Sequence, residues 1–172
     1  MTLYFAYGSN LNRADMRVRC PGADPVEPAR LHGWRLAFRG VADIERAPGE
    51  AVEGALWRLT PACVRSLDRY EGAPSHYRRL AVEVETASGP RGAMTYVMTS
   101  QRYLGLPSAH YRETIAQGFR DWDLPIASLD HAVEAARRRL HALGVERFRS
   151  DGRKRLRAIL DDPYRLAAEP RP

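Results

Sequence analysis

Hydrophobic and polar residues alternate along several stretches of the chain, a pattern typical of β-strands that bury one face. The clearest alternation covers residues 77–86, where Leu80, Val82 and Val84 would share the buried face. A turn at 88–90 precedes a second strand at 91–99, so this region predicts a β-hairpin. Three further strands are predicted at residues 2–7, 34–39 and 52–59.

Helices are predicted where apolar residues recur every three or four positions and where capping residues flank the segment. One helix is predicted to begin at Thr60, an N-cap residue that Pro61 follows, and to end at Gly72. The other helices are predicted at residues 12–19, 108–119 and 128–143, with a last short helix at 151–160. Prolines and glycines indicate loops at residues 23–28 and 40–51.

About five strands, mostly joined by short turns or single helices, predict an α+β fold in which the helices are concentrated late in the chain. The expected architecture is a small, curled mixed sheet or β-barrel with helices packed on its outside. The 172 residues suffice for one domain with a substantial core, which is predicted to cover residues 1–144. Residues 145–172 are predicted to be a basic, partly helical C-terminal extension.

The net charge of +6 is concentrated at the C-terminal end, because residues 131–172 contain eleven basic and six acidic side chains. A basic tail can bind nucleic acid, but no aromatic or nucleic-acid motif is interleaved with this one, which favours a solvated helical face. No apolar run has the length of a membrane span, and no signal peptide is expected at the N-terminus. Because only Cys20 and Cys63 are present, we expect a cytoplasmic protein with free thiols.

Residues 4–11, Y-F-A-Y-G-S-N-L, have the pattern of a short apolar strand that turns into a helix at a glycine. Gly8 can adopt a positive φ and allows other atoms to approach the backbone closely. A strand, a glycine turn and a helix N-terminus gather backbone N–H groups around one point, which suits a carboxylate, a phosphate or a developing oxyanion. A plain strand–helix connection has the same local pattern, so that alternative stays open from these residues alone.

Glu71 is the candidate acid–base group, because it ends an amphipathic helix and lies between Tyr70 and an aromatic-rich segment. Partial burial there would raise its pKa and suit it to proton transfer, although the spacing also fits an exposed residue before a helix C-cap. The five histidines form no ligand pair, so no metal site is predicted. Ser9 lacks the surroundings of a nucleophile elbow, and glycine-rich nucleotide-binding motifs are absent.

Two motifs in this order resemble the γ-glutamylcyclotransferase family of the AIG2-like superfamily: Y-F-A-Y-G-S-N-L at 4–11 and S-L-D-R-Y-E-G at 66–72, which Tyr77 follows. Other segments are also similar in order and spacing: A-R-L at 29–31 before W-R-L-A-F, V-E-G-A-L-W-R-L at 52–59, T-Y-V-M-T-S at 95–100 and P-S-A-H-Y at 107–111. The resemblance covers roughly residues 3–130, and the basic region beyond residue 135 departs from it.

The resemblance implies a small barrel-like mixed fold, no cofactor, and cleavage of a γ-glutamyl amide by intramolecular attack of the substrate's own α-amine. The products would be 5-oxoproline and a free amine or amino acid, so the expected enzyme is a transferase or lyase of glutathione metabolism. Glu71 would be the catalytic acid–base group. The substrate-binding residues that the family motifs imply are Tyr7, Gly8, Ser9, Asn10, Tyr77, Tyr96 and Tyr111.

Three interpretations stay open from the sequence. The chain could cleave γ-glutamyl amino acids, or it could act by the same chemistry on a γ-glutamyl amine or an acylated biosynthetic intermediate. It could also be a non-catalytic binding module on this fold, although the retention of Glu71 together with residues 7–10 argues against that. The expected partner is a small-molecule γ-glutamyl substrate, and neither a membrane nor a nucleic acid is expected to bind. A homodimer is a further expectation, although no sequence pattern fixes the oligomeric state.

Overall fold

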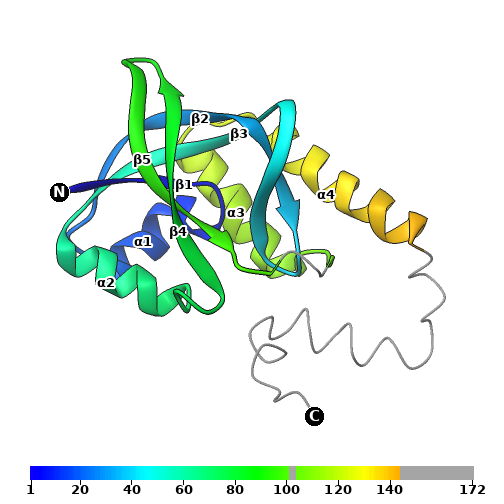
Figure 1. Ribbon diagram of the computed structural model, residues 1–172, viewed down its shortest axis with the longest axis horizontal. Helices are drawn as coiled ribbons and strands as arrows, with labels where there is room; N and C mark the ends of the chain where they lie inside the picture. Colours follow the sequence, from blue (N-terminus) through cyan, green and yellow to red (C-terminus); the bar gives the residue numbers. More distant parts are fainter. Residues whose placement is uncertain (101–103, 144–172) are drawn as a thin grey trace, which may run out of the picture.

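The computed structural model describes residues 1–100 and 104–143, and its centre is a closed barrel with the strand order β1-β3-β2-β4-β5 (Figure 1). The strands are β1 (Thr2–Ala6), β2 (Asp24–Phe38), β3 (Ala42–Leu59), β4 (Tyr77–Thr86) and β5 (Gly89–Met98). β1 pairs antiparallel with β3 and parallel with β5, which makes the sheet mixed and closes it. The predicted α+β fold with a barrel-like sheet is confirmed.

β2 and β3 form a long twisted ribbon, and the prediction of loops at 23–28 and 40–51 is wrong because most of these residues belong to it. Pro48 and Gly49 lie at a register shift opposite Gly33, and both glycines have positive φ, 86° and 77°. One extra stretch of chain in a strand produces a bulge without ending the strand pairing. The turn-forming residues therefore bend the ribbon and do not interrupt it.

Helices lie outside the barrel (Figure 1). They are the 3-10 turn η1 (Ser9–Leu11) and the α-helices α1 (Arg13–Arg19), α2 (Pro61–Tyr70), α3 (Ala109–Asp121) and α4 (Ile126–Ala142). Side-chain oxygens of Asn12, Thr60 and Ser108 accept backbone N–H groups at the starts of α1, α2 and α3. The α-helices α1 to α4 confirm the four helices predicted before residue 144, whereas the helix predicted at 151–160 falls outside the described residues. Among the described helices, none combines the length and the hydrophobicity needed to cross a bilayer.

The turn after β1 is held tightly between the barrel and α3. Gly118 of α3 lies so close to it that an added Cβ would be 2.5 Å from the Cβ of the fully buried Leu11. The Trp122 indole N–H donates to the Leu11 carbonyl oxygen at 2.8 Å, and the Trp57 indole N–H donates to the Asn10 carbonyl oxygen at 3.1 Å. Packing and hydrogen bonds from two sides therefore fix the backbone that carries the candidate loop.

Candidate active site

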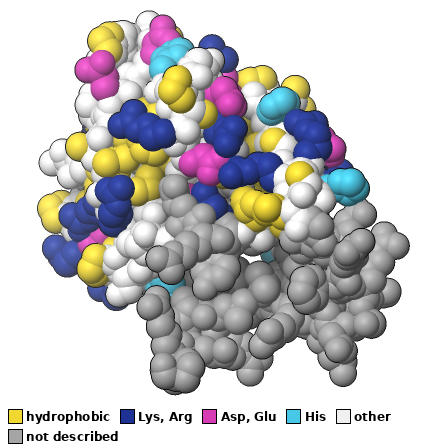
Figure 2. Space-filling model, turned by 45° about the vertical axis from the view of Figure 1, so that its right-hand side comes forward, with side chains coloured by type: hydrophobic (Ala, Val, Ile, Leu, Met, Phe, Trp, Pro, Cys, Tyr) yellow, Lys and Arg dark blue, Asp and Glu magenta, His cyan; other side chains and the backbone are white. Residues whose placement is uncertain are grey.

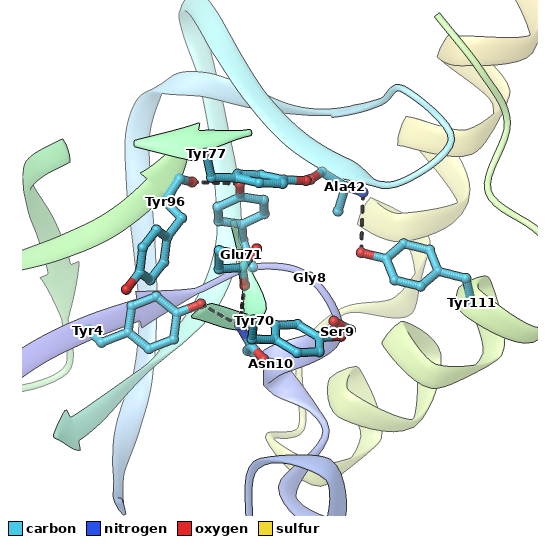
Figure 3. Close-up of a pocket in the computed structure, with 11 residues that line it drawn as sticks. Tyr4, Gly8, Ser9, Asn10, Ala42, Tyr70, Glu71, Tyr77, Tyr96 and Tyr111 are labelled. Atoms are coloured by element: carbon cyan, nitrogen blue, oxygen red, sulfur yellow. Dashed lines mark hydrogen bonds between the residues drawn. The ribbon is translucent and has the colours of Figure 1, made fainter. Parts of the chain in front are cut away.

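One cavity of the molecule is walled by tyrosines around a single carboxyl group, near the points where β1 ends and β4 begins (Figure 3). The residues that line it are Tyr4, Tyr7, Gly8, Ser9, Asn10, Ala42, Tyr70, Glu71, Tyr77, Tyr96 and Tyr111. All eight residues predicted for the site are among them, from the turn after β1, η1, the end of α2, β4, β5 and α3. The fold thus brings the predicted residues together, and their chemical roles stay predictions.

Three lining residues are missing from the sequence-based prediction. Tyr4 belongs to the same motif as Tyr7, and Tyr70 belongs to the same motif as Glu71. Their place in these motifs could have identified both as residues of the site. Ala42 gave no such signal, because it lies in a segment that the sequence pattern assigns to a loop. It lines the cavity through the unexpected start of β3.

Glu71 follows the last turn of α2, where its backbone N–H donates to the Leu67 carbonyl oxygen at 2.8 Å. Its side chain turns into the molecule, and the residue is only 8% exposed. Burial raises the pKa of Glu71 to about 7, while the hydrogen bond from Asn10 and the positive charge of Arg19 act in the opposite direction. A carboxyl group with a pKa near neutrality can both accept and return a proton, which is what general acid–base catalysis requires.

Asn10 connects the turn after β1 to Glu71. Its Nδ2 donates to Glu71 Oε1 at 2.8 Å and to the Tyr4 hydroxyl at 2.9 Å (Figure 3). Its Oδ1 accepts a hydrogen bond from Arg19 Nη1 at 2.9 Å. The amide of Asn10 therefore has protein partners at both ends, and one of them is the candidate acid–base group.

The tyrosines of the wall are anchored through their hydroxyl groups. Tyr7 donates to the Tyr96 carbonyl oxygen at 2.7 Å, and Tyr77 donates to the Ala42 carbonyl oxygen at 2.7 Å. The Ala42 N–H donates in turn to the Tyr111 hydroxyl at 3.3 Å. Hydrogen bonds at their hydroxyl ends therefore fix these rings in the wall of the cavity.

Burial also keeps these phenols neutral. It raises the pKa of Tyr111 to about 12 and the pKa of Tyr7 and Tyr4 well above the usual value. Glu71 supplies the only carboxyl group among the lining residues, so it is the lining group that changes its protonation state near pH 7.

Gly8 lines the cavity, and it does not use the positive φ that a glycine can adopt. Its φ is −119° and its ψ is −140°, a conformation that does not by itself demand glycine. What excludes a side chain there is space, because a Cβ would lie 3.0 Å from the Ala42 Cβ and 3.6 Å from the Tyr111 hydroxyl. The first backbone N–H groups of a helical turn have no partner within the turn, so those that start η1 can serve a ligand.

Metal ligands are not grouped in this part of the molecule. Within residues 1–100 and 104–143, no three His, Cys, Asp or Glu side chains are placed to hold a metal ion. Cys20 and Cys63 are both buried as free thiols.

Comparison with known proteins identifies the family. The sequence profile of the family described as "Gamma-glutamyl cyclotransferase, AIG2-like" matches residues 4–122. The chain belongs to the γ-glutamylcyclotransferase family. The matched span contains every cavity-lining residue and ends before α4, so α4 lies outside the part that defines this enzyme family.

Individual γ-glutamylcyclotransferases agree with this assignment. The chain is 33% identical over 138 residues to the gamma-glutamylcyclotransferase of Bos taurus, a match that covers 72% of this chain and 73% of the relative. It is 34% identical over 137 residues to the Mus musculus enzyme, with 72% of each chain covered. A solved structure titled "Gamma-glutamyl cyclotransferase" superimposes with a TM-score of 0.69 and 30% identity, covering 76% of this chain and 85% of that chain. The barrel described above is therefore the fold of this family.

Proposed function

We propose that this protein cleaves a γ-glutamyl amide, such as a γ-glutamyl amino acid, and releases 5-oxoproline with a free amine or amino acid. The observation that carries the proposal is Glu71, a buried carboxyl group whose pKa is raised to about 7 within a tyrosine-walled cavity. Membership of the γ-glutamylcyclotransferase family supports the same reaction. No cofactor is needed, because the nucleophile is part of the substrate.

The reaction is a proton transfer coupled to ring closure. Ionised Glu71 accepts a proton from the substrate's α-ammonium group, and the free amine then attacks the δ-carbonyl carbon to form a new C–N bond. Protonated Glu71 returns its proton to the leaving nitrogen as the old C–N bond breaks. The remaining excess proton on the ring nitrogen passes to water or to the released amine, which balances the reaction.

The cavity would contribute geometry as well as proton transfer. A γ-glutamyl chain must bend for its amine to reach its own δ-carbon, and holding reactants in such a geometry lowers the barrier considerably. The backbone at Gly8, Ser9 and Asn10 would hold the α-carboxylate or the developing oxyanion. Tyr7, Tyr77, Tyr96 and Tyr111 would enclose the glutamyl end and exclude water from Glu71.

A panel of γ-glutamyl compounds tests the proposal. Purified protein is incubated separately with γ-glutamyl amino acids, γ-glutamyl amines and acylated γ-glutamyl intermediates, and 5-oxoproline is measured by mass spectrometry. Release from the amino-acid group alone would support the main proposal, and release from another group would change the leaving group but keep the chemistry. If no member of the panel yields 5-oxoproline, the proposed reaction is wrong and the non-catalytic alternative takes its place.

The pKa of Glu71 predicts the pH dependence of the reaction. The base form must be present before the substrate amine can lose its proton, so kcat/KM should fall as the pH drops through about 7. Well below that pH, the ionised fraction falls about tenfold for each pH unit, and the rate should follow it. A pH profile measured with the best substrate of the panel checks this. A rate that stays constant from pH 7 to pH 5 would contradict the assignment of Glu71 as the base.

We also propose that the domain at 1–144 suffices for chemistry, since every cavity-lining residue precedes residue 112. A chain that ends at Gly144 is expected to keep a turnover close to that of the full chain. It retains the ion pair from Arg139 Nη1 to Glu45 Oε1, 2.6 Å long, which connects α4 to β3. The 5-oxoproline assay on both chains is the test. Near-complete loss of activity in a folded truncated chain would mean that residues 145–172 build part of the site.

Nucleic-acid binding is not part of the proposal. On the face drawn in Figure 2, basic side chains of the described residues are interspersed with acidic ones. Several arginines of the described residues form ion pairs with carboxylates, as Arg30 does with Glu53 and Arg35 with Glu45. Tight, salt-sensitive binding of DNA or RNA by the full chain would be the contrary result.

A cytoplasmic location, a homodimeric assembly and a place in glutathione metabolism are further parts of the proposal, each supported by the family resemblance.

A further inference from the structure

Arg19, at the end of α1, is a cation that reaches the candidate site without lining its cavity. Its Nη1 donates to Asn10 Oδ1 at 2.9 Å, and its Nη2 donates to Asp15 Oδ2 at 2.9 Å. The guanidinium group also lies over the ring of Tyr70, 4.2 Å from the ring centroid. Its side chain is only 17% exposed. Contacts on three sides therefore hold this guanidinium in one place.

The direction of the Asn10 amide follows from that placement. A carboxamide has an accepting oxygen at one end and a donating nitrogen at the other, whereas a guanidinium group can only donate. Arg19 must therefore face Oδ1, and this forces Nδ2 toward Glu71 and Tyr4, where it donates at 2.8 and 2.9 Å. A reversed amide would direct its nitrogen at the donating Arg19 guanidinium and its oxygen at the Glu71 carboxylate, so that two donors would face each other at one end and two acceptors at the other.

We propose that Arg19 is a positioning residue, which fixes the Asn10 amide so that its N–H group holds Glu71 Oε1 and leaves Oε2 for the substrate. The proposal rests on the proposed function in one respect, namely that Glu71 transfers the proton in the reaction. The contacts among Arg19, Asn10 and Glu71 stand by themselves. The bond from Arg19 to Asn10 and the bond from Asn10 to Glu71 share the Asn10 amide, so one hydrogen-bond chain runs from α1 through η1 to the end of α2.

The surroundings of Glu71 show what removing Arg19 would change. The charged group that acts on Glu71 from another element is Arg19 of α1, whereas the Glu71 charge itself helps to raise the pKa of Tyr4 of β1, of Tyr7 just after β1 and of Tyr111 of α3. Burial keeps the three phenols neutral, so Arg19 supplies the positive charge of this set. Its loss removes a stabilising charge and frees the amide that donates to the carboxylate. Both changes favour the protonated form of Glu71.

The test is a titration of Glu71 in ligand-free protein. Protein labelled with carbon-13 at the glutamate carboxyl groups is titrated by NMR, and the Glu71 signal is assigned as the one missing from Glu71→Gln. In Arg19→Met, the midpoint for Glu71 should rise by about one pH unit. In Arg19→Lys, which keeps the charge but not the planar fork, it should rise less. Arg17→Met is the matched control, because Arg17 is exposed on the same helix. The Glu71 midpoint in this variant should equal that of the wild type.

Activity gives an independent readout on the same variants. The acid limb of the kcat/KM profile should move upward with the midpoint in Arg19→Met, and the rate should recover toward the wild-type value at pH 9. A role in folding alone would lower the rate equally at every pH. An unchanged Glu71 midpoint in folded Arg19→Met overturns the inference, and if that variant does not fold, the same result in Arg19→Lys does so. A wild-type protein that forms no 5-oxoproline would refute the proposed function and leave the titration result standing.

Discussion

Replacing Glu71 with glutamine is expected to lower the turnover of a γ-glutamyl substrate by at least about 10²-fold, because general acid–base catalysis typically contributes 10²–10⁴-fold. The amide of glutamine keeps the size of the side chain and its position after α2. Its oxygen can still accept the hydrogen bond that Asn10 Nδ2 gives to Glu71 Oε1 at 2.8 Å. What the substitution removes is the ability to take up a proton and return it.

Substrate affinity should change far less than turnover in this variant. The turn at residues 7–10 and the anchored tyrosines are left in place, and they would still enclose the glutamyl end. A loss confined to the rate, with binding retained, is typical of an interaction needed mainly in the transition state. Calorimetric titration with the best substrate, beside a 5-oxoproline assay, measures the two effects separately.

Glu83→Gln is the matched control, because Glu83 is exposed on β4 and takes no part in the cavity. It should leave both turnover and affinity unchanged. A fully active Glu71→Gln variant would contradict the proposed mechanism. A folded variant that is inactive and also fails to bind would give Glu71 a role in holding the substrate and not in proton transfer.

Much of the fold could be predicted because its determinants are local. The alternation at 77–86 follows from a strand with one buried face, and Thr60, Pro61 and Gly72 mark the ends of α2 by capping chemistry. The continuation of β3 through Pro48 and Gly49 could not be predicted in the same way. It depends on pairing with β2 across a bulge, and local residue preferences for turns oppose it.

The same distinction between local and long-range determinants applies to the candidate site. Motifs 4–11 and 66–72 contain the residues that meet in the cavity, so sequence reasoning could name them together. The bond between Asn10 and Glu71 joins positions 61 residues apart, and only the closed barrel sets its length and direction. Arg19 was missed because its importance comes from a contact with Asn10 and not from any motif of its own.

Gly8→Val is expected to reduce kcat/KM by about 10²-fold, the scale of loss that follows a misplacement of about 1 Å at a reacting centre. An added Cβ would lie 3.0 Å from the Ala42 Cβ, which is closer than side chains normally approach, and 3.6 Å from the Tyr111 hydroxyl. The two further methyl groups of valine would enter the space where the substrate is proposed to bind. The Gly8 backbone has a negative φ, so the variant should not suffer the strain of a left-handed conformation.

The variant should therefore lose more activity than stability. Gly8→Ala, which adds the Cβ alone, should fall between the wild type and Gly8→Val in kcat/KM. Gly92→Val on β5 is the control, because a Cβ at Gly92 meets no atom within 4 Å. Thermal unfolding and the 5-oxoproline assay on all four proteins provide the comparison. If folded Gly8→Val turns over substrate at the wild-type rate, the space beside Gly8 is not where the glutamyl end lies, and the proposed pose must move away from η1.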